Sequence, residues 1–232
     1  MKRRRNVAAF VLAGGASSRM GRDKGLLTFG GVPLIVHTVR LLEPLVARVT
    51  VVGARSRYGA LGLRTMQDYS AGSKGTKRSR RGPLAGMAAA LAATRSAWNL
   101  IVACDLPYLS AEWLDWLLAR AAESGAQAVV PRTARGLEPL AAVYRRECGA
   151  VIVAALARRE RKVTNVLREL HVEAILQREW RRLDAHAQVL KNMNAPEDYE
   201  RARRWWEAER SRRREAIAYH PPRREIGPKR KE

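Results

Sequence analysis

Short apolar segments alternate with helical patterns along the first half of the chain. Five segments are apolar or β-branched and bounded by Gly, Pro or charged residues, which is the pattern of strands: residues 6–12, 49–53, 63–67, 99–105 and 127–131. Between them, apolar residues recur at helical spacing over residues 33–42, 83–93 and 111–122. Several strands are apolar on both faces, as in a buried parallel sheet. The alternation predicts an α/β fold, a Rossmann-like three-layer sandwich whose mostly parallel sheet is covered by helices.

The limits of the helices and of the domain follow from local signals. Pro33 and Pro83 suit the first turn of a helix, where a missing N–H costs nothing, and Ser110 suits an N-cap. With 47% hydrophobic residues, the chain can bury one sizeable core or two small ones. We expect a single domain over residues 1–218, followed by a basic, disordered tail over 219–232 that is rich in Pro and charge.

Several classes of protein are disfavoured. No apolar run approaches the roughly 18–20 residues that a membrane span needs. Cys104 and Cys148 give neither a disulfide framework nor a metal-ligand spacing, so we expect reduced thiols in a cytoplasmic protein. Residues 1–18 do imitate a secretory signal, with a basic start and a small-residue end. Their apolar part is short, however, and cleavage near Ala13 or Ala16 would cut a segment dense in Gly, Arg and Lys, so we favour a buried strand that runs into a loop.

The formal net charge of +22 points to anionic partners: nucleic acid, an anionic membrane surface or phosphorylated small molecules. The basic residues gather at the N-terminus, in the segment 74–81 and beyond Glu200. No aromatic residues interleave the basic segment as base-stacking platforms would. We therefore interpret most of this charge as solvated surface and tails, and expect neither a nucleic acid nor a membrane as partner.

The segment LAGGASSRMGRDKG, residues 12–25, follows the first expected strand at the sheet edge where ligands bind in such folds. Gly14 and Gly15 allow a tight turn and let main-chain N–H groups approach an anion. Arg19 and Lys24 add positive charge. Neither GxxxxGK[ST] nor GxGxxG is present, so the segment predicts a phosphate-binding loop of another kind.

The pattern L-A-G-G-x-x-x-R-M-G-x-D-K resembles the signature of the nucleotidyltransferase superfamily, which couples nucleoside triphosphates to phosphorylated acceptors. Four further stretches follow in order: GPLAGMAAAL (82–91) after Asp68, ACDLPYLS (103–110), EPLAAVY (138–144, an apolar return strand) and NMNAPEDYE (192–200, just before the last expected helix). Together they make residues 6–205 similar to molybdenum cofactor guanylyltransferase, the family that joins GMP to molybdopterin. The fold implied is of the nucleotide-diphospho-sugar transferase type.

The resemblance also implies site residues. Those expected to bind GTP are Leu12, Ala13, Gly14, Gly15, Lys24, Asp68 and Asp105. Lys24 and Arg19 would act on the phosphates, and Asp105 would hold the Mg²⁺ cofactor; these three are the expected catalytic residues. Asn192 and Asn194 would lie near the metal and the acceptor. Implied partners are GTP and molybdopterin, with cofactor-synthesis proteins or target molybdoenzymes as further candidates and a monomer as the expected state.

Two departures from the family pattern stand out. Ala195 occupies a position where the family often has an N-cap Thr, whose loss would cost about 1 kcal/mol. The basic stretch YSAGSKGTKRSRR, residues 69–81, is longer than usual. It could steer anionic substrates, which we favour because only Tyr69 could anchor it, or act as a lid whose arginines contact the transition state.

The expected chemistry is attack of an acceptor phosphate on the α-phosphorus of GTP, which needs no general base because the phosphate is already ionised. The histidines match no motif and are expected to be structural or on the surface: His37, His171, His186 and His220. Guanine is the expected base, flanked by the backbones of 12–13 and 82–86. Two alternatives stay open: cytidylyl or other nucleotidyl transfer to molybdopterin or a sugar phosphate, and a catalytically inactive basic binding protein.

Overall fold

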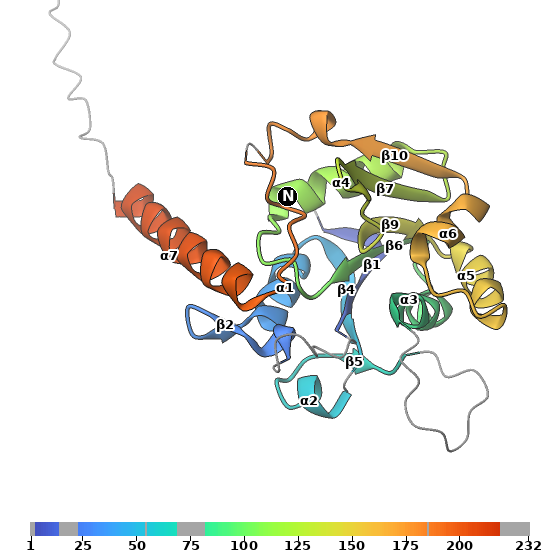
Figure 1. Ribbon diagram of the computed structural model, residues 1–232, viewed down its shortest axis with the longest axis horizontal. Helices are drawn as coiled ribbons and strands as arrows, with labels where there is room; N and C mark the ends of the chain where they lie inside the picture. Colours follow the sequence, from blue (N-terminus) through green and yellow to red (C-terminus); the bar gives the residue numbers. More distant parts are fainter. Residues whose placement is uncertain (1–2, 14–22, 54, 69–81, 185, 219–232) are drawn as a thin grey trace, which may run out of the picture.

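The computed structural model describes residues 3–13, 23–53, 55–68, 82–184 and 186–218 (Figure 1). In these parts of the chain, an eight-stranded sheet has the order β10-β7-β9-β6-β1-β4-β5, and β8 pairs with β7. Its strands are β1 (Arg4–Leu12), β4 (Val46–Val52), β5 (Thr65–Met66), β6 (Trp98–Ala103), β7 (Ala128–Thr133), β8 (Gly136–Leu137), β9 (Ala141–Arg145) and β10 (Val172–Leu176). The short strands β2 (Thr28–Phe29) and β3 (Val32–Pro33) form a separate hairpin.

The strand order reverses at β1. This strand runs parallel to β4 on one side and to β6 on the other, and β5 continues beyond β4. The chain therefore leaves β1 in one direction and returns across it to build the other half. In open α/β sheets, ligands bind beyond the carboxyl ends of the strands at such a reversal. Leu12 and Ala103 lie at these ends.

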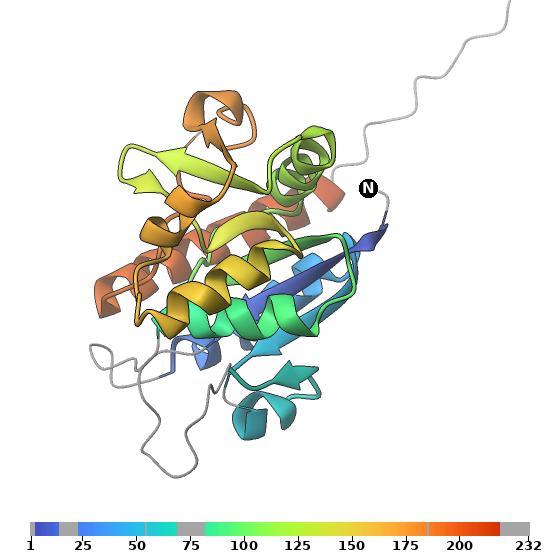
Figure 2. The same ribbon diagram turned by 90° about the vertical axis from the view of Figure 1, so that its right-hand side faces the viewer.

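Helices cover both faces of the sheet, because alternate residues of a buried strand point to opposite sides. Val7, Ala9 and Val11 of β1 pack with α1 (Leu34–Leu42) and α4 (Ala111–Glu123). Ala8 and Phe10 pack with α3 (Gly82–Ala93) and α5 (Cys148–Ala157), which lie side by side on the other face (Figure 2). The three-layer α/β architecture expected from the sequence is confirmed.

Short elements complete these layers and the edges. They are α2 (Arg55–Gly59), α6 (Val163–Val166) and the 3₁₀ turns η1 (Lys24–Leu26), η2 (Leu167–Glu169) and η3 (Gln177–Glu179). The last helix, α7 (Pro196–Ala218), begins inside the stretch 192–200, which was expected to precede it. Its first turns pack on the β2–β3 hairpin through a cluster that includes Phe29, Tyr108 and Met193. None of the helices described is long and apolar enough to cross a membrane. The expected tail, 219–232, lies outside the described residues.

Several expected boundaries shift. The strand expected over 99–105 ends at Ala103, because the chain enters a turn there, and Asp105 lies in that turn. The strand expected over 63–67 shrinks to the two residues of β5, at the edge of the sheet. The return strand in 138–144 is present as β9 but runs antiparallel to β6 and β7. The three expected helices occur, and the Ser110 hydroxyl caps α4 by accepting a hydrogen bond from the Trp113 N–H at 3.2 Å.

Gly86 permits close packing of α3 on the end of β1. A Cβ at this position would lie 3.2 Å from Leu12 Cδ2 and 3.7 Å from Val52 Cγ1. We expect Gly86→Val to lower the free energy of unfolding by about 1–3 kcal/mol through overpacking, measured by urea denaturation. Gly125→Val is the control, because a Cβ there meets no atom within 4 Å. Equal losses in both variants would contradict this explanation.

Candidate active site

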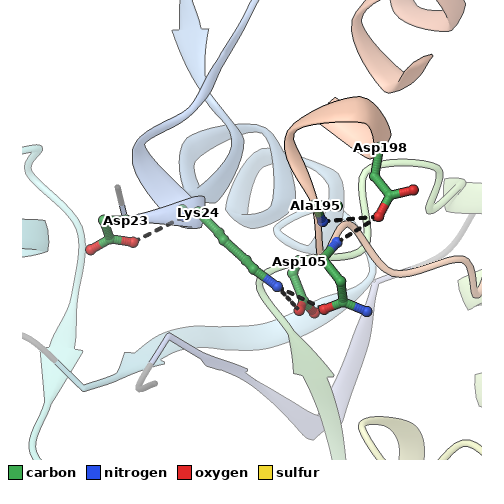
Figure 3. A network of polar contacts seen from close by, with 7 residues as sticks. Asp23, Lys24, Asp105, Ala195 and Asp198 are labelled. Carbon is green, nitrogen blue, oxygen red and sulfur yellow. Dashed lines mark hydrogen bonds and ion pairs between the residues drawn. The ribbon is translucent and has the colours of Figure 1, made fainter. Parts of the chain in front are cut away.

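Three side chains from distant parts of the chain meet beyond the carboxyl ends of β1 and β6 (Figure 3). The Lys24 ammonium donates hydrogen bonds to Asp105 Oδ2 at 3.2 Å and to Asn194 Oδ1 at 2.8 Å. The Lys24 and Asp105 side chains are only 17% and 20% exposed, so their ion pair is screened less than one on the open surface. The structure thus joins three of the residues expected from the sequence.

Asp105 is held by the sheet and by the segment that carries Asn194. The N–H of Cys104 donates to the Leu12 carbonyl at 3.1 Å, which ties the end of β6 to the end of β1. The carbonyl of Asp105 accepts from the N–H of Met193 at 2.9 Å. Because Met193 is fully buried in the cluster beneath α7, this bond fixes the segment against the turn after β6.

Lys24 is held through its neighbour Asp23. The Asp23 carboxylate caps η1 by accepting from the N–H of Gly25 at 3.0 Å, and it also pairs with Arg57. The hydroxyl of Tyr58, a fully buried residue of α2, lies 2.8 Å and 2.9 Å from the two carboxylate oxygens. Burial, followed by the charge of nearby groups, raises the pKa of Tyr58, so it remains a donor. This brace holds the turn that presents Lys24.

Asn194 is held at the start of α7. The carboxylate of Asp198 accepts from the N–H groups of Asn194 at 2.9 Å and Ala195 at 3.0 Å. Ala195 has no side-chain oxygen with which to accept from the N–H groups of the first turn. Asp198 supplies the other half of a capping box, because its carboxylate binds the N–H groups of the two residues that precede the helix. These hydrogen bonds, that from Asn194 above all, lower the pKa of Asp198.

The oxygen atoms gathered here suit a hard cation together with a phosphate. They are the carboxylate of Asp105 and the amide oxygen of Asn194, which already accept from an ammonium group. Burial, followed by the charge of Asp105, raises the pKa of the adjacent Cys104 thiol, so a competing thiolate is disfavoured. No group of three His, Cys, Asp or Glu residues that could hold a metal is found in the described part of the chain. This donor set fits Mg²⁺, which is usually bound by one or two carboxylates plus substrate phosphates.

The other site residues expected from the sequence are not part of the contact among Lys24, Asp105 and Asn194. Leu12 and Ala13 lie at the end of β1, where the Ala13 N–H donates to the Val52 carbonyl at 2.9 Å. Asp68 is exposed beyond β5, and Asn192 is half-buried. Among the described residues, neither makes a hydrogen bond or ion pair with the three residues that meet. Gly14, Gly15, Arg19 and the basic stretch 69–81 lie outside the described residues.

The residues that hold the site in place were not expected from the sequence. Asp23 belongs to the opening motif, and an Asp directly before a turn is a recognisable cap signal. Tyr58 and Met193 carry no comparable signal, because one is an isolated aromatic residue and the other stands between two polar residues. Their roles depend on contacts between segments far apart in the sequence.

Comparisons with known proteins agree with this geometry. The family described as MobA-like NTP transferase domain matches residues 9–175. A probable molybdenum cofactor guanylyltransferase from Pelotomaculum thermopropionicum is 33% identical over 194 residues, which cover 83% of this chain and 90% of the relative. A molybdenum cofactor guanylyltransferase from Pseudomonas aeruginosa is 36% identical over 190 residues, 81% of this chain and 89% of the relative.

Solved structures share the fold. The crystal structure of molybdopterin-guanine dinucleotide biosynthesis protein A from Archaeoglobus fulgidus superposes with a TM-score of 0.74 at 24% identity, covering 87% of this chain and 99% of the other. A 4-diphosphocytidyl-2C-methyl-D-erythritol synthase from Anaerococcus prevotii gives 0.59 at 12% identity, with 87% and 98% covered. At these identities the likeness is one of fold.

The cap formed by Asp198 predicts a pH dependence. Because its pKa is lower in the folded chain, its contribution is complete above the unfolded value of about 3.9 and is lost as the pH falls through the folded value. We expect Asp198→Ala to lower the free energy of unfolding by about 1 kcal/mol near pH 7, and by less near pH 3. Urea denaturation at both pH values measures this.

Glu197→Ala is the matched control, since Glu197 is an exposed acidic residue in the same turn. A loss for Asp198→Ala that is unchanged at acid pH, or matched by the control, would contradict the capping role.

Proposed function

The chain belongs to the family of molybdenum cofactor guanylyltransferases and carries a MobA-like NTP transferase domain, and from this we propose that it transfers GMP from GTP to molybdopterin. The products are molybdopterin guanine dinucleotide and pyrophosphate. The observation that carries the proposal is the contact of Lys24 with Asp105 and Asn194 at the strand reversal. This contact supports the proposal because an ammonium group and two oxygen acceptors meet at the edge of the sheet where this fold binds its ligands.

The reaction joins two anions. An oxygen of the acceptor phosphate attacks the α-phosphorus of GTP, and a new P–O bond forms. The bond from that phosphorus to the oxygen bridging to the β-phosphorus breaks, and its electron pair leaves with pyrophosphate. The protein must therefore position both substrates and offset their repulsion. We assign Lys24 to the charge that develops on the leaving group, with Arg19 and the backbone of Gly14 and Gly15 as further phosphate ligands.

Asp105 and Asn194 are the residues that would hold a metal. A divalent cation is general among nucleotidyltransferases of this family, and Mg²⁺ is our assignment because the donors are oxygen atoms. When bound, it supplies charge neutralisation of the phosphate oxygens. In the structure, Lys24 neutralises the Asp105 carboxylate. A bound cation would take over part of that role, and the Lys24 ammonium would then be available to contact the phosphates.

Guanine is the base we propose. The backbones of 12–13 and 82–86 would flank it, with Asp68 facing the nucleotide, as the resemblance implies. A monomeric state, a cytoplasmic location and protein partners among cofactor-synthesis proteins or target molybdoenzymes remain predictions from the sequence.

Nucleotide choice tests the proposed reaction directly. With molybdopterin as acceptor and Mg²⁺ present, we expect faster turnover with GTP than with CTP, measured as pyrophosphate release. Faster turnover with CTP would assign the chain to cytidylyl transfer. No turnover with either nucleotide, despite nucleotide binding, would favour an inactive binding protein.

Removal of the central charges tests the site. We expect Asp105→Ala to abolish transfer because the metal anchor is lost. Lys24→Ala should lower kcat by about 10²–10³-fold, as removal of one preorganised stabilising group does. Arg168→Ala, at an exposed position before β10, is the control and should leave turnover unchanged. Near-native rates for both site variants at saturating Mg²⁺ would overturn the assignment.

A further inference from the structure

A groove of about 420 Å³ lies on the α3 face of the sheet, over β1 and β4 and beside β5. Its lining runs from Arg5, near the start of β1, to Phe10 and to Met66, which pairs with Val52 at the end of β4. In Figure 2, β4 and β5 extend beyond α3, the helix that covers the neighbouring strands. Ala8, Phe10 and Met66 give the groove an apolar lining. Ala8 and Phe10 are almost fully buried, so they form its floor.

The rim of the groove is strongly basic. Four of the residues that line it are exposed arginines: Arg5, Arg48, Arg64 and Arg95. No acidic residue is among the lining residues. Within the described part of the chain, none of the four guanidinium groups forms a hydrogen bond or ion pair, whereas that of Arg4, at the start of β1, pairs with Asp115. A cluster of like charges repels itself, and an anionic ligand would relieve that repulsion.

A threonine hydroxyl adds a polar group to the groove. Thr50 lines the groove, is only 7% exposed and makes no side-chain hydrogen bond with any described residue. It lies opposite Phe10 in the parallel pair β1–β4, so both side chains are on the α3 face. The neighbouring Thr94 is different, because its hydroxyl already accepts from the Ser96 N–H at 3.1 Å. The Thr50 hydroxyl oxygen is not itself fully buried, so it offers a donor and an acceptor to a chain bound in the groove.

The backbone around the groove favours carboxylates over a phosphate group. Phosphate sites usually offer free N–H groups at a helix N-terminus or a backbone nest. Here β1 and β4 use their N–H groups in the sheet, and α3 ends at Ala93, so it directs its carbonyls toward the groove. The charge comes instead from long arginine side chains, which pair in a bidentate manner with carboxylates and phosphates alike. The preference for carboxylates therefore rests on the lack of free backbone N–H groups here and on the enrichment of arginine in protein interfaces.

We propose that this groove docks an acidic segment of a partner protein. Carboxylates of the segment pair with the arginine rim, an apolar side chain contacts Phe10 and Met66, and a polar group reaches Thr50. At about 3.3 Å per residue, Arg5 lies about 23 Å from Leu12 along β1, whereas Phe10 lies only about 7 Å from it. Arg5, on the rim, is therefore farther from the active-site edge than the apolar floor is.

The test uses a short fluorescent peptide of glutamates with one central leucine, titrated with the full chain at low salt and followed by anisotropy. We expect Arg48→Glu/Arg95→Glu to weaken binding by about tenfold or more, because attraction is replaced by repulsion at two positions. The control, Arg168→Glu/Arg178→Glu, makes the same change of net charge at exposed positions away from the groove and should weaken binding less than about twofold. Replacing the leucine by glutamate should also weaken binding.

Three results would overturn the proposal. Equal weakening by both pairs of substitutions would reduce the effect to net charge. No effect of the leucine would remove the apolar contact. Displacement of the peptide by oligothymidylate or pyrophosphate at lower concentrations than by unlabelled peptide would show that phosphates are preferred. Urea denaturation of every variant verifies folding. Because the experiment measures peptide binding and not turnover, its outcome does not depend on the proposed guanylyl transfer.

Discussion

The ion pair between Lys24 and Asp105, shared with the amide oxygen of Asn194, is the interaction on which the site depends. A lysine that is 17% exposed needs partners, because a charge removed from water is costly unless it is paired. The partners are 81 and 170 residues away in sequence. They reach Lys24 only when β1 and β6 are neighbours and α7 begins above the turn that follows β6. This contact therefore forms only when the strands have their native order and the last helix is in its native position.

Each member of the trio has its own support. Tyr58 and Gly25 hold Asp23 beside Lys24, the carbonyl of Asp105 is bound by Met193, and Asp198 caps the segment that ends in Asn194. A site that stabilises charge gains from such rigidity, since groups that are already oriented need no reorganisation during the reaction. The aromatic cluster beneath α7 extends this support. Within it, the His37 ring packs on Trp206 at 4.4 Å and contacts the Phe29 carbonyl at 2.8 Å, a structural role as expected.

Positively charged side chains are paired with carboxylates at one edge of the sheet and unpaired around the groove. At the carboxyl edge, the described cations Lys24 and Arg57 are paired with carboxylates in a compact arrangement. The arginines around the groove have no acidic partner among the described residues. Paired groups keep a fixed geometry, which chemistry needs, whereas unpaired and exposed ones adapt to a partner surface. The net charge of +22 therefore does not distinguish cations held in ion pairs from the unpaired arginines around the groove.

The sequence by itself determined the fold class, because alternating strand and helix patterns admit few ways to bury their apolar faces. The resemblance of its motifs to those of a known family also singled out Lys24, Asp105 and Asn194. The sequence could not supply the antiparallel direction of β9, which is set by pairing with β6 and β7 and leaves no trace in local periodicity. Nor could it assign Tyr58 or Met193. Those roles were decided by the tertiary structure alone, because each is a contact between groups whose distance is fixed only when the layers pack.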